Sequence, residues 1–196
     1  MGEPYDDFTL PAALYYDSIS HYEQASIHQE NGDQVAAERY SRSALLAAFG
    51  FFEAQLNQIA FAYAAAHRDR LGQIETDVLE EKETALDDQG RIVRKDKFYR
   101  TESRFSFLVL FLSGQDFNRG GETWQRFCES RELRDIWTHP KPPFYTWSLT
   151  PEKVRTAIVS VREMFISLSA MMRCEPPLWL RPIDEVLDGV KRDSPQ

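Results

Sequence analysis

The sequence predicts an all-α protein, an antiparallel bundle of four or five helices with a charged helical hairpin inserted between its halves. Three observations lead to this fold class. Apolar residues recur at intervals of three and four along most of the chain, which is the spacing of one helix face. Proline, threonine, asparagine and glycine stand where such stretches begin and end. No stretch alternates apolar and polar residues convincingly enough to predict a strand.

The bulk properties are those of an ordinary globular domain. The chain has 196 residues, of which 42% are hydrophobic and 28% charged. We expect one domain over residues 1–175 and a short docked segment with a tail over residues 176–196. The net charge of −8 excludes a strongly basic surface, although a local basic pocket remains compatible with it. No signal peptide or membrane-spanning run is predicted, so the cytoplasm is the expected location and no membrane partner is expected.

Two helices are predicted in the first third of the chain. Pro11 opens the first, which ends near Asn31-Gly32. The second runs from Gln34 to about Arg68 and is apolar on most sides, which predicts a buried central helix. Glu53 is the one charge in its apolar centre. A carboxylate there needs a partner, and the arginines of the helix described below are the expected partners, either to support a site or simply to hold two helices together.

Residues 69–115 are expected to form the insert. The stretch 69–90 is acidic, the stretch 91–104 is basic, and Asp87-Asp88-Gln89-Gly90 between them is typical of a turn. These features predict two antiparallel helices, acid against base, followed by a return helix over Phe105–Leu112. A basic strip near an RNA path is the alternative, and the hairpin could also carry a dimer contact.

The next helix begins at Glu122 or Thr123 and carries an apolar stripe that buries it. Arg134 flanks that stripe. His139 precedes Pro140, and a residue before proline is pushed out of the helical region. On an unbroken helix the side chains of Arg134 and His139 would be about 140° apart. A break at His139 would let the imidazole swing back toward the guanidinium. Thr150-Pro151 then opens the last main helix.

Arg134 and His139 are the candidate reactive pair. Arginine offers a planar fork of donors that matches phosphate, and histidine exchanges a proton near neutral pH. The spacing alone arises by chance in a chain of this length, and a histidine in the last turn of a helix is favoured by the helix dipole in any case. Asp135, which follows the arginine, and Arg131, one turn upstream, supply the context, and Arg131 is also a candidate substrate contact.

Two residues of the following loop are candidate substrate contacts. Lys141 lies near His139 in sequence and would touch a phosphate. Tyr145 would stack on an RNA base, or else cover the core or a partner subunit. The sequence contains no cluster that predicts a metal site and no motif that predicts a cofactor.

In this context the segment Arg134–Pro140 resembles the R-x4-6-H motif of the HEPN superfamily of small helical domains. The motif arginine maps onto Arg134 and its histidine onto His139. The residue after the arginine is usually Asn, Asp or His in that family, and here it is Asp135. The segment Phe51–Asn57 also resembles the second-helix pattern of many HEPN domains, in which a glutamate, here Glu53, faces the motif. The resemblance covers the motif helix, the helix after it and one upstream helix.

The resemblance implies a metal-independent endoribonuclease that acts as a homodimer with a composite site. The RNA 2′-hydroxyl would attack the adjacent phosphate and leave a 2′,3′-cyclic phosphate. His139 would be general acid or base, Arg134 would stabilise the phosphate charge, and Asp135 would orient either of them. A toxin-like role with a cognate inhibitor or antitoxin as partner would follow. The alternatives are a non-catalytic HEPN-like module that binds a nucleotide, nucleic acid or protein, and a scaffold in which Arg134, Glu53 and His139 form a structural network.

Overall fold

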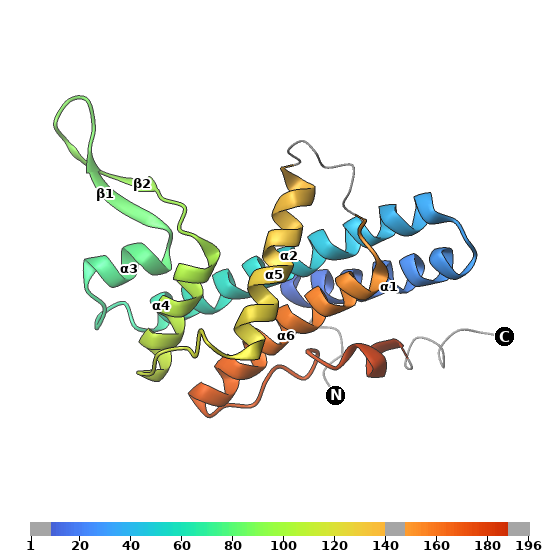
Figure 1. Cartoon of the computed structure of the whole chain (residues 1–196). Helices are drawn as coiled ribbons and strands as arrows, with labels where there is room; N and C mark the ends of the chain where they lie inside the picture. The colour runs from blue at the N-terminus through green and yellow to red at the C-terminus, as the bar shows by residue number, and fades with distance from the viewer. Residues whose placement is uncertain (1–8, 140–147, 188–196) are drawn as a thin grey trace, which may run out of the picture. The chain divides into compact units, whose positions relative to one another are not determined.

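The protein is mostly helical, which confirms the predicted all-α class in its coarse form (Figure 1). The computed structural model describes residues 9–139 and 148–187. In chain order the elements are α1 (Leu10–Glu30), α2 (Gln34–Ala66), α3 (Gln73–Leu79), β1 (Lys82–Leu86), β2 (Ile92–Asp96), α4 (Thr101–Ser113), α5 (Glu122–Thr138) and α6 (Pro151–Met172).

The chain divides into two compact units. Unit 1 comprises Met1–Phe52 and Asn118–Gln196, and unit 2 comprises Glu53–Phe117. Helix α2 contributes its first part to unit 1 and its last part to unit 2. The region 69–115, predicted as an insert, lies wholly within unit 2.

Unit 1 is built around a cluster of aromatic rings. Phe52 of α2 packs at 4.6 Å from Phe127 of α5 and at 5.0 Å from Phe165 of α6, between ring centroids. Phe51 packs at 5.2 Å from Tyr15 of α1. All five side chains are buried, so four helices share one core, and such pairs add to the stability that burial alone provides.

The segment after α6 lies against the same core. The Tyr16 hydroxyl donates to the carbonyl of Trp179 at 3.2 Å, and Arg162 Nε donates to the carbonyl of Leu180 at 3.2 Å. The Trp179 ring meets Phe51 edge-on at 5.8 Å. Ile183 is also buried. Side-chain donors of α1 and α6 therefore bond to backbone carbonyls of this segment before its short helical stretch at 183–187.

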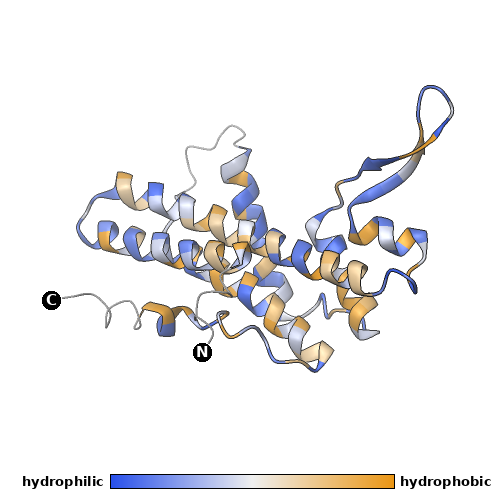
Figure 2. Cartoon of the chain, turned by 180° about the vertical axis from the view of Figure 1, so that it is seen from behind, coloured by the Kyte–Doolittle hydropathy of each residue, from blue (hydrophilic) through white to orange (hydrophobic). Residues whose placement is uncertain are grey.

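The predicted pair of charged helices in unit 2 is wrong. Residues 82–96 form an antiparallel β-hairpin instead, in the register Lys82↔Asp96 to Leu86↔Ile92. The prediction that no strand would occur is corrected with it. Apolar and polar residues are mixed along both strands (Figure 2). The helical spacing that motivated the prediction belongs to α3 alone, which spans seven residues.

The turn explains why a hairpin forms here. The Asp87 carboxylate accepts hydrogen bonds from the backbone N–H groups of Gln89 and Arg91, both at 2.9 Å. Gly90 has a φ of +74°, which glycine adopts without strain. Acid does face base, as expected, but across strands: Lys97 Nζ lies 2.9 Å from Glu83, and Lys82 pairs with Asp96. A tight turn that brings opposite charges face to face across two segments favours strands over helices.

Helix α2 is the one described helix that is long and apolar enough to cross a membrane. No such stretch is expected from the sequence, and that expectation is corrected. Length and composition do not separate a membrane span from a core helix, and 44% of the apolar window of α2 is buried inside the protein. The cytoplasmic location stays a prediction.

Candidate functional site

Helix α5 ends where the sequence predicts. His139 follows the last helical residue with φ −130° and ψ 62°, outside the helical region, while its N–H still bonds to the carbonyl of Asp135 at 2.9 Å. The proline that follows accounts for this break. The His139 side chain is exposed. Its Cα lies about 7.5 Å beyond that of Arg134 along an ideal helix axis. The predicted swing of the imidazole toward Arg134 stays a prediction.

Arg134 is held in a defined place on α5. Its side chain is 22% exposed. The guanidinium carbon lies 5.2 Å from the centroid of the Phe49 ring of α2, a cation–π contact. Nε lies 3.0 Å from a carboxylate oxygen of Asp135. The adjacent aspartate therefore lies at ion-pairing distance from the arginine, and its predicted orienting role stays a prediction.

A second arginine joins this face, and sequence reasoning missed it. The guanidinium carbon of Arg42, on α2, lies 5.6 Å from the centroid of the Trp137 ring of α5. The contact of Arg42 with Trp137 and that of Arg134 with Phe49 join α2 to the last two turns of α5. Two guanidiniums, each in contact with an aromatic ring, thus lie along the last turns before His139. The spacing of Arg42 and Phe49 is helical, but nothing in the sequence pairs that face with α5.

The other predicted site residues are less fully placed. Arg131 is half-buried on α5. Lys141 and Tyr145 lie outside the described residues. Glu53 is exposed and belongs to unit 2, one helical turn after Phe49 on α2. Its predicted pairing with the arginines of α5 stays a prediction.

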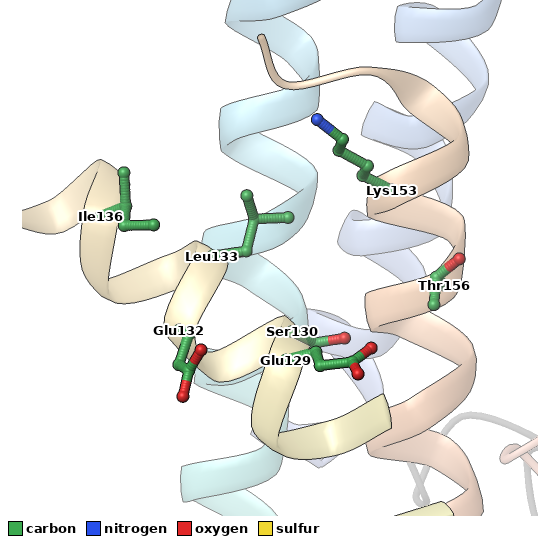
Figure 3. A pocket seen from close by; sticks show the side chains of 7 residues that line it. All are labelled: Glu129, Ser130, Glu132, Leu133, Ile136, Lys153 and Thr156. Carbon is green, nitrogen blue, oxygen red and sulfur yellow. The ribbon is translucent and has the colours of Figure 1, made fainter. Parts of the chain in front are cut away.

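A cavity of about 280 Å³ opens between α5 and α6 (Figure 3). Leu133 and Ile136 form its apolar part, and the side chains of Glu129, Glu132 and Lys153 stand around it. Neither Arg134 nor His139 lines it.

A second cavity, of about 260 Å³, lies within unit 2 and is lined in part by Glu53 and Arg104. Arg104 is only 6% exposed. One of its terminal nitrogens donates to the Leu79 carbonyl at 3.0 Å, and the other bonds to Asn57 and lies 3.1 Å from Glu81. Burial lowers the pKa of Arg104, and the charge of Glu81 opposes that effect. Three protein groups thus contact the terminal nitrogens of this arginine.

No protein-family model, curated protein or solved structure matches this chain. The chemical roles of the site residues therefore rest on their geometry and on the motif.

Proposed function

We propose that the protein is a HEPN-like, metal-independent endoribonuclease built on an antiparallel four- or five-helix bundle. The observation that carries the proposal is the end of α5. There a guanidinium is fixed by an aromatic ring and an adjacent carboxylate, and an exposed imidazole follows five residues later at a helix terminus fixed by proline. One group can hold a phosphate and the other can move a proton.

The proposed reaction needs only these side chains and the RNA. A base takes the proton of the 2′-hydroxyl, the 2′ oxygen forms a bond to phosphorus, and the bond to the 5′ oxygen breaks. An acid then protonates the departing 5′ oxygen. His139 fills one of these roles, and His139 of a second copy fills the other in a homodimer. Arg134 stabilises the negative charge that builds on the phosphate oxygens.

The test is RNA cleavage by the purified protein in excess chelator, with analysis of the product ends. Arg134→Ala and His139→Ala are compared with matched controls, Arg155→Ala and His21→Ala. Arg155 pairs with Asp184 on an exposed part of α6, and His21 stands on α1 beside Tyr40. We expect 2′,3′-cyclic phosphate ends from the wild type and the controls, and activity at least about 10²-fold lower in the two site variants. Equal cleavage by all five proteins would refute the proposal.

A second candidate function is a non-catalytic HEPN-like module that binds a partner protein. The cavity between α5 and α6 favours it, because its apolar residues Leu133 and Ile136 are flanked by the carboxylates of Glu129 and Glu132. Such a surface suits an amphipathic helix with basic residues. A folded wild type that cleaves no RNA, but binds a basic amphipathic peptide in a manner abolished by Leu133→Asp, would replace the enzyme with this module.

A further inference from the structure

Arg42 is an exposed cation whose role within the protein is small. Its guanidinium rests against the Trp137 ring at 5.6 Å. No ion pair to Arg42 occurs among residues 9–139 and 148–187. An exposed cation–π contact is a weak interaction, so it orients the side chain without neutralising it. The full positive charge of Arg42 stays available to an external anion.

The carboxylates nearest in sequence on both helices are already engaged. Glu38, one turn before Arg42 on α2, accepts a hydrogen bond from Gln34 at 3.2 Å. Asp135, two residues before Trp137, pairs with Arg134. The guanidiniums of Arg42 and Arg134 and these two carboxylates balance in formal charge, so the seam between α2 and α5 offers an external anion the exposed guanidinium of Arg42 rather than a net positive surface, in a chain whose net charge is −8.

The contact with Trp137 places Arg42 beside the final turn of the motif helix. Trp137, which holds it, is two residues before His139, or about 3 Å along the axis of a helix. Arg134 lies one turn further back, against Phe49. An RNA strand whose reacting phosphate sits between Arg134 and His139 would pass Arg42 with a neighbouring phosphate.

We infer that Arg42 binds the RNA backbone at a phosphate next to the reacting one, with Trp137 as its positioning residue. This inference rests on the proposed function. Arginine suits the task because its planar fork binds two phosphate oxygens at once. Neutralising a phosphate also releases condensed counterions, so each such contact adds about 0.7 to the salt slope of single-strand binding.

The experiment measures binding separately from cleavage. The probes are 2′-O-methyl oligomers of uridine and of adenosine, which cannot react by 2′-hydroxyl attack, and the readout is fluorescence anisotropy over a series of salt concentrations. Arg42→Ala is compared with Arg42→Lys and with the control Arg155→Ala. Far-UV circular dichroism checks folding. If the alanine variant does not fold, Arg42→Gln takes its place.

We expect Arg42→Ala to raise the Kd roughly tenfold for both sequences, because a hydrogen bond to a charged group is lost. The salt slope should fall by about 0.7. Arg42→Lys should keep the slope and lose part of the affinity, since lysine keeps the charge without the planar fork. Trp137→Leu should raise the Kd when it is introduced into the wild type, but it should leave the Kd unchanged when it is introduced into the Arg42→Ala variant.

Three results would overturn the inference: no binding by the wild type, an Arg42→Ala variant with unchanged Kd and slope, or an equal loss in Arg155→Ala. The outcomes also separate this inference from the proposed function. RNA binding that depends on Arg42 without any cleavage would refute the nuclease and keep the phosphate contact. Cleavage that is lost in Arg134→Ala, together with binding that Arg42→Ala leaves unchanged, would support the nuclease and refute the phosphate contact at Arg42.

Discussion

Replacing Arg104 by methionine tests how much a buried cation contributes to unit 2. Arg104 is 6% exposed, and its terminal nitrogens serve Leu79, Asn57 and Glu81. Methionine fills most of the same space, so the loss comes from polar partners rather than from a cavity. The carbonyl of Leu79 and the amide oxygen of Asn57 both lose their bond to Arg104.

The expected loss is about 3 kcal/mol in the free energy of unfolding. Breaking a buried pair costs about 3–5 kcal/mol when the remaining charge is stranded. The side chain of Glu81 is 24% exposed, so water can solvate its carboxylate once Arg104 is removed. The expected loss therefore lies at the lower end of that range. Nε of Arg104 has no hydrogen-bond partner in the described part of the chain, so its removal costs nothing further.

Urea unfolding followed by two probes measures this loss. Far-UV circular dichroism reports on the whole chain. Tryptophan fluorescence reports on unit 1, because residues 53–117 contain no tryptophan. We expect the dichroism transition of Arg104→Met to move to lower urea, and the fluorescence transition to move less. The control is Arg91→Met, whose ion pair with Asp87 is 68% exposed on the arginine side, and which should cost less than about 1 kcal/mol. Similar losses in the two variants would refute the reasoning, because burial would then not matter.

Three further predictions concern the hairpin and the core. Burial alone would raise the pKa of Asp77, but hydrogen bonds from Gln73, Arg94 and Thr84 hold that pKa below its ordinary value. The stability that this carboxylate provides is therefore complete at a pH above the ordinary pKa and is lost as the pH falls through the lowered pKa. Asp77→Asn should accordingly weaken the fall of the melting temperature at acid pH in a thermal-unfolding series. Gly90→Ala should cost about 1–2 kcal/mol, because alanine is strained at a φ of +74°, whereas Gln89→Ala should be near neutral in the same urea titration. Phe52→Ala should cost about 3–5 kcal/mol, because the fully buried ring contacts both Phe127 and Phe165; a loss below 1 kcal/mol by urea unfolding would contradict the shared aromatic core.

The sequence predicted best where one residue type dictates the backbone. Pro140 ended α5 at Thr138 as expected, and Thr150-Pro151 opened α6. The long apolar stretch from Gln34 became α2, which ends at Ala66, near the predicted end. In each case a local steric rule or a sustained period determines the element, without reference to distant parts of the chain.

The prediction failed where two local patterns competed. Residues 82–96 contain charges at a spacing compatible with either a helix or a ladder. The strands won because the Asp87 turn brings Lys82 opposite Asp96, and because Arg94 reaches Asp77 of α3 at 2.7 Å. The contact between Arg94 and Asp77 is tertiary, so the spacing of residue types along the sequence does not predict it. Arg42 escaped notice for the same reason, since its partner Trp137 is far along the chain.

Three arginines in this protein differ in what surrounds their charge, and that difference decides what each can do. Arg104 is buried, and protein acceptors use its terminal nitrogens, so its task is structural. Arg134 is 22% exposed and has one ring and one carboxylate, so part of its charge is already used. Arg42 is exposed, and within residues 9–139 and 148–187 its guanidinium contacts a ring and forms no ion pair. An aromatic face orients a guanidinium without supplying a negative charge, so an incoming phosphate meets the least competition at Arg42 and more at Arg134. Under the proposed function, Arg42 therefore holds a phosphate of the RNA backbone, and Arg134 stabilises the charge on the phosphate that reacts.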